Sequence, residues 1–283
     1  MSEFILNLSC PDRPGIVAAV SSLLFTLGFN IRESHQFGDI ETKRFFMRVS
    51  IESGKPDNSQ SQLESEFNTI AKQFDMTWRV HDKADKPRVL LMVSRFDHCL
   101  VDLLYRSEIG SLNMTIVGVV SNHEDARERV EAAHVPFHYW PVTPETKLEN
   151  ETKLKNLITS ENVELIVLAR YMQVLSPEFT AQYPDHIINI HHSFLPSFKG
   201  AVPYSRAFER GVKMIGATAH FVTSDLDEGP IITQGVADIR HDMSVNDLID
   251  VGRDVERRTL AQAIKLYTQR RVLRNGLKTV IFQ

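Results

Sequence analysis

The stretch ELIVLA, residues 164–169, is a short run of apolar and β-branched residues between polar segments. Three similar runs occur in the same part of the chain: VLLMVS at residues 89–94, MTIVGVVS at 114–121 and HIINI at 186–190. Segments of helical character, such as DARERVEAAHV and ETKLKNLITS, lie between them. Nearly continuous apolar strands that alternate with helices are typical of a parallel sheet covered on both faces. The pattern predicts an open, mostly parallel α/β sheet domain.

The N-terminal part of the chain has a different order of elements. In chain order we expect a strand in FILNLSC (4–10), a helix in PDRPGIVAAVSSLLFTLGFN (11–30), strands in IRESHQF (31–37) and RFFMRVSIE (44–52), a helix in LESEFNTIAKQF (63–74) and a strand in MTWRVHD (76–82). In the first helix, Asp12 is the expected N-cap, Pro14 the first helical residue and Gly28 the exit. The order βαββαβ predicts a ferredoxin-like domain.

A polar segment, HDKADKP at residues 81–87, separates the two patterns. We therefore expect a first domain at residues 1–83, a linker at 84–87 and a second domain at 88–283. A long amphipathic helix at residues 245–269 closes the second domain.

Bulk composition narrows the class of protein. Of the 283 residues, 42% are hydrophobic and 24% charged, as in a globular protein with a buried core. The net charge of -4 provides no general attraction to nucleic acid or acidic membranes, and no run approaches the ~18 apolar residues of a membrane span. The two cysteines, Cys10 and Cys99, favour free thiols in a reducing compartment and supply no zinc site. Because the start MSEFILNLSC lacks signal-peptide features, we expect a cytoplasmic protein with no nucleic-acid or membrane partner.

Two adjacent histidines stand in NIHHSFLPSF, residues 189–198. If the strand continues through them, Asn189 and His191 lie on one face and His192 on the other, so the histidines point apart and are poorly placed for one metal ion. The side chains of Asn189 and His191 leave the strand ~7 Å apart, and both can contact one small carbonyl group. An amide donor beside an imidazole suits stabilisation of an oxyanion. On spacing alone, the alternative is that Asn189 and His191 are a polar pair whose hydrogen bonds are satisfied at the strand end, with no catalytic role.

A second segment, GATAHFVTSDLDEGPII at residues 216–232, reads as a strand, an acidic loop and a return strand. The loop contains Asp225, Asp227 and Glu228. A carboxylate beside an imidazole can orient the ring, raise its pKa and hold a water molecule. A solvated acidic loop is the ordinary alternative.

The two segments together resemble the folate-dependent formyltransferase family, and the similarity extends from about Arg88 to the C-terminus. The signature of that family is Asn-x-His on a strand, followed some tens of residues later by His-x-Val-Thr-x-x-x-Asp. The resemblance implies that Asn189, His191 and Asp227 are catalytic and that His220 supports Asp227 or packs beside it.

The segment LARYMQVLSP, residues 168–177, resembles the part of the family whose backbone contacts the pterin ring. The matching positions are Met172, Gln173, Val174 and Leu175. Backbone groups can present a polar edge to a ligand while constraining the side chains only weakly. An ordinary strand exit that packs on its neighbours is the alternative interpretation.

The N-terminal half resembles an ACT domain, a ferredoxin-like module that binds small effectors, often amino acids. PDRPGI (11–16) and LGFNIRES (27–34) carry the resemblance. It implies that Asp12, Gly15 and Asn30 contact an effector, commonly where two ACT domains pair, and therefore that the protein forms a homo-oligomer. The alternative is that these residues form only a capped helix and its flanking turns, and bind no effector.

Members of the formyltransferase family differ in the acceptor of the formyl group. Those acting on glycinamide ribonucleotide have a Gly-rich turn after the first strand that receives a phosphate, whereas the turn here, SRFDH at residues 94–98, has no glycine. The member acting on initiator tRNA carries a basic C-terminal domain, which we do not expect here. Water is then the expected acceptor, with 10-formyltetrahydrofolate as substrate, formate and tetrahydrofolate as products, and no cofactor or metal. Transfer to an amine and an inactive amino-acid or folate sensor are the alternatives.

Overall fold

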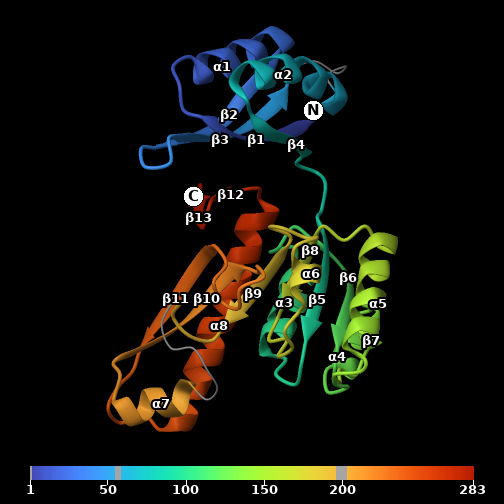
Figure 1. The fold of residues 1–283 in the computed structure, drawn as a ribbon, viewed down its shortest axis with the longest axis vertical. Helices are drawn as coiled ribbons and strands as arrows, with labels where there is room; N and C mark the ends of the chain where they lie inside the picture. Colours follow the sequence, from blue (N-terminus) through green and yellow to red (C-terminus); the bar gives the residue numbers. More distant parts are fainter. Residues whose placement is uncertain (1, 55–58, 196–202) are drawn as a thin grey trace. The chain divides into compact units, whose positions relative to one another are not determined.

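The computed structural model describes residues 2–54, 59–195 and 203–283. The chain forms two compact units (Figure 1). The first contains the chain up to Lys86 together with Arg270–Asn275 and Thr279–Gln283, and the second contains Pro87–Gln269 with Gly276–Lys278. The boundary near residue 86 agrees with the expected linker, but the last residues belong to the first unit rather than to the second domain.

The first unit has the predicted βαββαβ order. Its elements are β1 (Glu3–Pro11), α1 (Ile16–Leu27), β2 (Phe29–Asp39), β3 (Arg44–Ser53), α2 (Gln60–Phe74) and β4 (Thr77–Asp82). The four strands form one antiparallel sheet in the order β2-β3-β1-β4. Alternate residues of β1 point to the helices, where they pack with residues of α1 and α2 that recur every three or four positions.

The start of α1 differs from the prediction. The helix begins at Ile16, and the N-cap is Gly15, whose φ of 95° lies in the left-handed region that glycine adopts readily. Asp12 therefore does not cap this helix, and Pro14 precedes it. The predicted exit is confirmed, because Gly28 is left-handed and its N–H bonds to the carbonyl groups of Leu24 and Phe25.

The sheet face away from α1 and α2 carries the C-terminal hairpin, formed by β12 (Val272–Asn275) and β13 (Lys278–Ile281). Phe46 of β3 packs in a buried cluster with Leu273, Val280 and Phe282. The local pattern of residues 270–283 does not distinguish these apolar residues from those of the second domain. The prediction that they belong to the second domain was therefore wrong.

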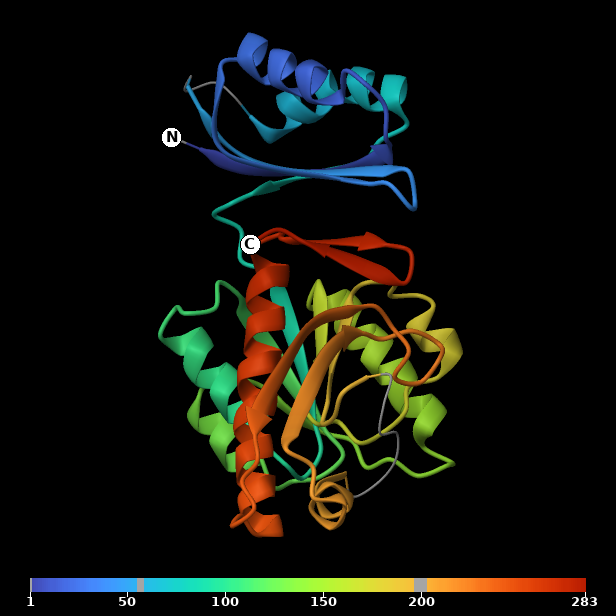
Figure 2. The same ribbon diagram turned by 90° about the vertical axis from the view of Figure 1, so that its left-hand side faces the viewer.

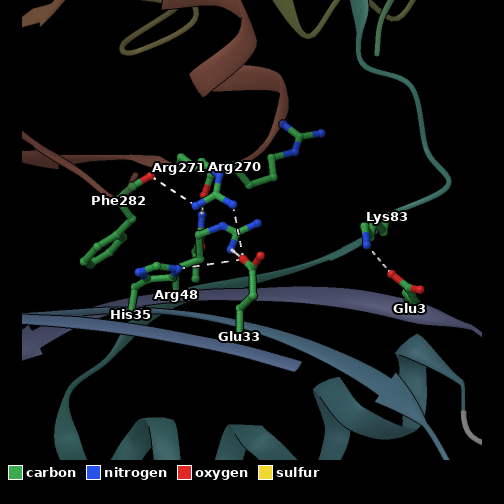
Figure 3. Close-up of polar contacts among 9 residues, drawn as sticks. Glu3, Glu33, His35, Arg48, Lys83, Arg270, Arg271 and Phe282 are labelled. Carbon is green, nitrogen blue, oxygen red and sulfur yellow. Dashed lines mark hydrogen bonds and ion pairs between the residues drawn. The ribbon is translucent and has the colours of Figure 1, made fainter. Parts of the chain in front are cut away.

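Charged groups fix the hairpin on the sheet. Figure 3 shows the guanidinium groups of Arg48 and Arg271 directed at the carboxylate of Glu33, with nitrogen-to-oxygen distances of 3.0 and 3.2 Å. Arg271 also donates to the carbonyl oxygen of Phe282. Because Arg48 is almost fully buried, its charge needs this paired carboxylate.

The second unit is built on a seven-stranded sheet in the order β11-β10-β9-β8-β5-β6-β7. Its elements are β5 (Arg88–Val93), α3 (His98–Glu108), β6 (Thr115–Ser121), α4 (Arg127–Ala132), β7 (Phe137–Tyr139), α5 (Lys147–Ser160), β8 (Leu165–Leu168), α6 (Pro177–Thr180), β9 (Ile187–His191), α7 (Pro203–Arg210), β10 (Met214–Phe221), β11 (Ile231–Asp238) and α8 (Val245–Thr268). The five strands from β7 to β9 are parallel, and β10 and β11 are antiparallel to their neighbours. The predicted open, mostly parallel sheet is confirmed.

Helices cover both faces of this sheet (Figure 2). On one face, residues of α5 and α6 pack against the buried side chains of β5, β8 and β9. On the other face, α8 packs along β9, β10 and β11 and also against α3 and α7. None of the helices in the described part of the chain is both long and apolar enough to cross a membrane.

The strand order places a switch point between β5 and β8. The chain proceeds from β5 to β6 and β7 on one side, then returns to β8 and β9 on the other. In open α/β sheets, ligands bind outside the carboxyl ends of the strands at such a point. The segments after β5, β8 and β9 are therefore where the fold predicts a site.

The pH dependence of unfolding tests the packing of β4 in the first unit. Burial, together with the charges of Arg270 and Arg79, lowers the pKa of His81 to about 3. The unfolded chain binds a proton at this residue below about pH 6.5, whereas the folded chain does not, so stability falls as the pH decreases. We expect a loss of about 2 kcal/mol between pH 8 and pH 5 that is absent in His81→Gln.

The measurement is urea unfolding followed by the fluorescence of Trp78, which packs on Phe67 in this unit, in a Trp140→Phe background. The protein that retains His81 and the His81→Gln variant contain the same carboxylates. The difference between the pH dependences of their free energies of unfolding therefore reports on His81 alone. Equal pH dependence in both proteins would contradict the assignment.

Candidate active site

Two neighbouring strands and one loop carry the predicted catalytic residues. Asn189 and His191 are on the same face of β9, as the alternation predicts, and His220 of β10 pairs directly with Asn189. Asp227 lies in the loop between β10 and β11, with a left-handed φ of 58°. The loop can fold back only because residue 229 is glycine, since a Cβ atom there would lie 1.7 Å from the carbonyl oxygen of Phe221.

The four side chains meet. Asp227 Oδ2 lies 3.3 Å from His191 Nδ1, and Asp227 Oδ1 lies 3.7 Å from His220 Nε2. Asn189 Nδ2 lies 3.3 Å from His220 Nε2. An amide, two imidazoles and a carboxylate from segments nearly forty residues apart thus converge on one place.

The hydrogen bonds of His220 determine its tautomer. Its Nδ1 lies 2.8 Å from the carbonyl oxygen of Phe221, which can only accept, so Nδ1 carries the proton. Burial lowers the pKa of His220 and favours the neutral ring. Nε2 is then a bare acceptor for the amide of Asn189, and His220 fixes the orientation of that amide.

The contacts of Asp227 keep it ionised. Burial alone raises the pKa of this carboxyl group, but the hydrogen bond from His191 and the nearby imidazoles outweigh it, and the pKa lies below its ordinary value. The opposite nitrogen of the ring, His191 Nε2, is buried without a hydrogen-bond partner among the described residues. The imidazole is therefore held from one side and has an unused polar atom on the other.

His192 is not where alternation along a continued strand places it. The strand ends at His191, so the two rings are not separated by the sheet but meet edge to face with centroids 5.0 Å apart. Both line the same cavity, and the expectation that they point apart was wrong. Burial and the charge of Arg170 lower the pKa of His192 to about 4. Residues 196–198 of the same stretch lie outside the described residues.

The site opens into a cavity of about 650 Å³. Its lining includes the predicted catalytic residues together with Met172, Gln173, Val174 and Leu175, the four residues expected to contact the pterin ring. Met172 and Val174 are 55% and 56% exposed, whereas Leu175 packs into the core. The structure thus brings the two predicted sets of residues to one hollow.

The ends of the segment Met172 to Leu175 are held by two residues that sequence reasoning missed. Ser94 Oγ accepts from the Met172 N–H at 2.9 Å, so this N–H is already used within the protein. Glu151 of α5 accepts from the N–H and the hydroxyl of Ser176 at 2.7 and 2.6 Å. Ser94 stands at the carboxyl end of a strand, which is a usable signal, but nothing local marks Glu151.

A second buried carboxylate, Glu256 of α8, also lines the cavity and was not predicted. It accepts hydrogen bonds from His98 Nε2 at 2.8 Å and from the hydroxyl of Tyr204 at 2.6 Å, and it lies 3.4 Å from Arg170 Nε. Burial raises the pKa of Glu256, but His98, Arg170 and Tyr204 outweigh it and the pKa lies below its ordinary value.

Metal-ligating atoms of His98, Cys99 and Glu256 lie within 4.8 Å of one another. Arg170 supplies the positive charge that Glu256 needs, and burial raises the pKa of the Cys99 thiol, which favours the protonated form over the thiolate that binds metals. The arrangement favours an ion pair over a metal site. Cys99 and Cys10 are both buried and free.

The three expected effector residues of the first unit are not brought together. Asp12 and Gly15 lie before α1, next to the end of β1 where Pro11 pairs with Arg44. Asn30 pairs with Glu52 at the other end of β3, eight residues away, or about 27 Å along the strand. One effector of amino-acid size cannot contact both ends within a single chain.

The comparisons with known proteins agree with this geometry. The formyl transferase family model matches residues 87–264, and the ACT domain model matches residues 4–68. Formyltetrahydrofolate deformylase of Bacillus subtilis is 47% identical over 278 residues, which cover 98% of this chain and 93% of that protein. The chain belongs to the formyltetrahydrofolate deformylase family.

Solved structures extend the comparison to the whole fold. The crystal structure of formyltetrahydrofolate deformylase from Burkholderia mallei matches with a TM-score of 0.96 and 49% identity, and covers all of both chains. Glycinamide ribonucleotide transformylase 1 from Symbiobacterium toebii matches with a TM-score of 0.65 and 28% identity, over 70% of this chain and 95% of that protein. The deformylase family therefore shares its parallel-sheet domain with a formyl transferase and adds an ACT domain to it.

The tautomer of His220 gives a direct test of this deformylase site. We expect ring ¹⁵N shifts of a neutral Nδ1–H imidazole that protonates only below pH 6.5, because burial disfavours the charged form. NMR titration of the ¹⁵N-histidine-labelled protein provides the measurement, and His220→Gln assigns the signal. A midpoint at or above pH 6.5, or an Nε2–H tautomer, would contradict the proposed orientation of Asn189.

Proposed function

We propose that the chain hydrolyses 10-formyltetrahydrofolate to formate and tetrahydrofolate, and is thus a hydrolase of the formyltetrahydrofolate deformylase type. The observation that carries the proposal is the convergence of Asn189, His191 and Asp227 at one cavity. Met172 to Leu175 also line this cavity, and we call them the folate wall. The names of the relatives, which match over nearly the whole chain, support the same reaction.

The folate wall is suited to a flat heterocycle with donors and acceptors on its edge. Within the described residues, the backbone N–H and carbonyl groups of Gln173, Val174 and Leu175 have no hydrogen-bond partner. Ser94 and Glu151 hold the segment at both ends, so these groups are fixed before a ligand arrives. We infer that they bind the pterin edge, which places the formyl group on N10 near His191.

Asp227 supplies the base. Its carboxylate is ionised at neutral pH, and its contact with His191 leaves lone pairs for a water molecule. The carboxylate orients this water and takes a proton from it as the oxygen attacks the formyl carbon. A new C–O bond forms, and the carbonyl oxygen becomes an oxyanion.

Asn189 and His191 stabilise the oxyanion. The amide of Asn189 gives one hydrogen to His220 and has a second for the oxyanion, while Nε2–H of protonated His191 provides another donor. As the C–N10 bond breaks, His191 gives its Nε2 proton to N10. Asp227 then releases the proton taken from water to solvent, and Nε2 of His191 takes up a proton from solvent, which restores both groups. We propose that the reaction needs no cofactor or metal, because the chain supplies the base, the acid and both oxyanion donors.

One assay separates this function from the alternatives. Purified protein is incubated with 10-formyltetrahydrofolate in the absence of any amine, and formate and tetrahydrofolate are measured. We expect both products in equal amounts. Turnover only after an amine is added would show a transferase, and no turnover in either condition would show a binding protein without catalysis.

Substitution of Asn189 tests the oxyanion donor. We expect Asn189→Ala to lower kcat about a hundred- to a thousandfold, which is the usual loss for one preorganised donor, while the protein remains folded. Asn113→Ala, an exposed change in the same unit, is the matched control. A rate for Asn189→Ala close to that of the control would remove Asn189 from the catalytic residues.

Substitution of Asp227 tests the base. Asparagine is the suitable replacement, because it tolerates the left-handed φ of 58° and keeps the side-chain shape. We expect Asp227→Asn to lose more activity than Asn189→Ala and its residual rate to vary little with pH. The measurement is kcat as a function of pH, with circular dichroism to verify folding. Full activity in the folded variant would exclude a base role.

The first unit extends the proposal to regulation. We infer that it binds an amino-acid effector, because the ACT model covers most of it. Since Asp12 and Gly15 lie far from Asn30, we propose a homo-oligomer in which Asp12 and Gly15 of one copy face Asn30 of another. We also place the protein in the cytoplasm, where two free thiols are stable.

A further inference from the structure

A second part of the cavity lining is made of large side chains around a buried carboxylate. We call the following six residues the acceptor wall: Phe96, His98, Arg170, Tyr204, Arg253 and Glu256. Glu256 is only 1% exposed and is at their centre. Tyr204 bonds to its Oε1, while His98 and Arg170 engage its Oε2, so both carboxylate oxygens are in use.

Packing fixes the two aromatic rings of the acceptor wall. Phe96 is in the turn after β5 that has no glycine, and the guanidinium carbons of Arg170 and Arg253 each lie 5.9 Å from its ring centroid. Tyr204 of α7 lies across α8 where residue 252 is glycine. A Cβ atom on Gly252 would be 2.3 Å from the ring of Tyr204, so the ring occupies space that any other residue would fill.

The two walls of the cavity come from opposite faces of the sheet. Leu175 of the folate wall packs with the cluster that includes α5 and α6. His98, Tyr204 and Glu256 belong to α3, α7 and α8, which cover the other face. Both histidines also line the cavity, where His191 contacts Asp227 and His192 lies edge to face with Tyr204 of the acceptor wall, with ring centroids 6.4 Å apart.

We propose that the acceptor wall excludes amines from the formyl carbon and so determines that water is the acceptor. The inference rests on the proposed hydrolysis and names the residues that decide its specificity. In transfer to an amine, the amine nitrogen forms a new bond to the formyl carbon, the C–N10 bond breaks, and one amine proton moves to N10. The catalytic residues of this chain could serve that reaction equally well, so the difference must lie in access.

Space and polarity both act against a larger acceptor. A cavity of about 650 Å³ is in the range of roughly 300–1,000 Å³ that holds one drug-sized ligand, and the folate itself is of that size. An acceptor on the side away from the folate wall meets the rings of Phe96 and Tyr204. Its polar groups do not reach the carboxylate of Glu256, which is only 1% exposed and already has Tyr204 and His98 as hydrogen-bond donors. Water is small enough to enter beside the two rings and does not need a hydrogen bond to Glu256.

Competition between water and amines of different size tests the proposal. The protein is supplied with 10-formyltetrahydrofolate and either hydroxylamine or glycinamide, and the ratio of formylated amine to formate is measured. For the wild type we expect almost no formylglycinamide. For Phe96→Ala, and more so for Phe96→Ala combined with Tyr204→Ala, we expect the glycinamide ratio to rise at least about tenfold, with a smaller change for the smaller hydroxylamine.

Three further variants identify the cause. Phe208→Ala removes a ring of the same kind from α7 that is 46% exposed and does not line the cavity, and it should leave the ratio unchanged. Tyr204→Phe keeps the ring and loses only the bond to Glu256, so the exclusion should persist. Gly252→Ala removes no side chain, but its added Cβ atom displaces the Tyr204 ring. We expect this variant to raise the ratio of formylglycinamide to formate.

An equal glycinamide ratio in the wild type and in the folded double variant would overturn the proposal. Phe96 is 49% exposed, so Phe96→Ala alone retains the fold and provides the same comparison if the double variant does not fold. Release of formate by the wild type without any amine is a separate measurement. It tests the proposed hydrolysis, so its failure is distinguishable from an unchanged ratio.

Discussion

The antiparallel pairing of β10 with β9 is the constraint on which the site depends. It sets His220 opposite Asn189, so that one side chain can orient the other. On its other side β10 pairs antiparallel with β11, so the chain reverses after Phe221, and the turn that closes at Gly229 brings Asp227 to His191. A slip of one residue would turn His220 to the opposite face and remove the contact that fixes the amide.

Surroundings give two carboxylates in one cavity different tasks. Asp227 is half-buried and Glu256 is fully buried, and both have a pKa below the ordinary value because hydrogen-bond donors and cations outweigh burial. Glu256 has every oxygen engaged by residues of three other segments, so it serves as a fixed support. Asp227 keeps capacity for a further partner. The same functional group can therefore hold a wall or act on a water molecule, depending on its neighbours.

Local pattern predicted the parts of the structure that local physics determines. The apolar runs predicted the strands, period-two alternation placed Asn189 and His191 on one face, and the left-handed exit at Gly28 followed from residue type. Alternation failed for His192, because the strand ends one residue earlier. The N-cap at Asp12 failed because Gly15 makes the turn into α1 instead.

Other features depend on contacts that no local pattern encodes. Ser94, Glu151 and Glu256 act on segments far away in sequence, and each is an ordinary polar residue within its own element. Their roles appear only when the sheet order is known. The signature residues were recognisable because a family resemblance already combines such distant positions, which single-sequence periodicity cannot do.

The route of the C-terminus affects how the ACT-type unit can be transferred to another protein. After α8, the chain leaves the catalytic unit and ends as a hairpin on the sheet of the ACT-type unit, where Phe282 and Arg271 are anchored. The chain therefore passes from one unit to the other near residues 86 and 270, and the short turn Gly276–Lys278 also belongs to the second unit. Proteolytic cleavage near residue 86 would not release this unit, because residues after 270 still connect it to the rest of the chain. A gene fusion that included residues 1–86 alone would lack the C-terminal hairpin that covers Phe46. Transfer of the complete unit therefore requires both the N-terminal residues and the C-terminal hairpin.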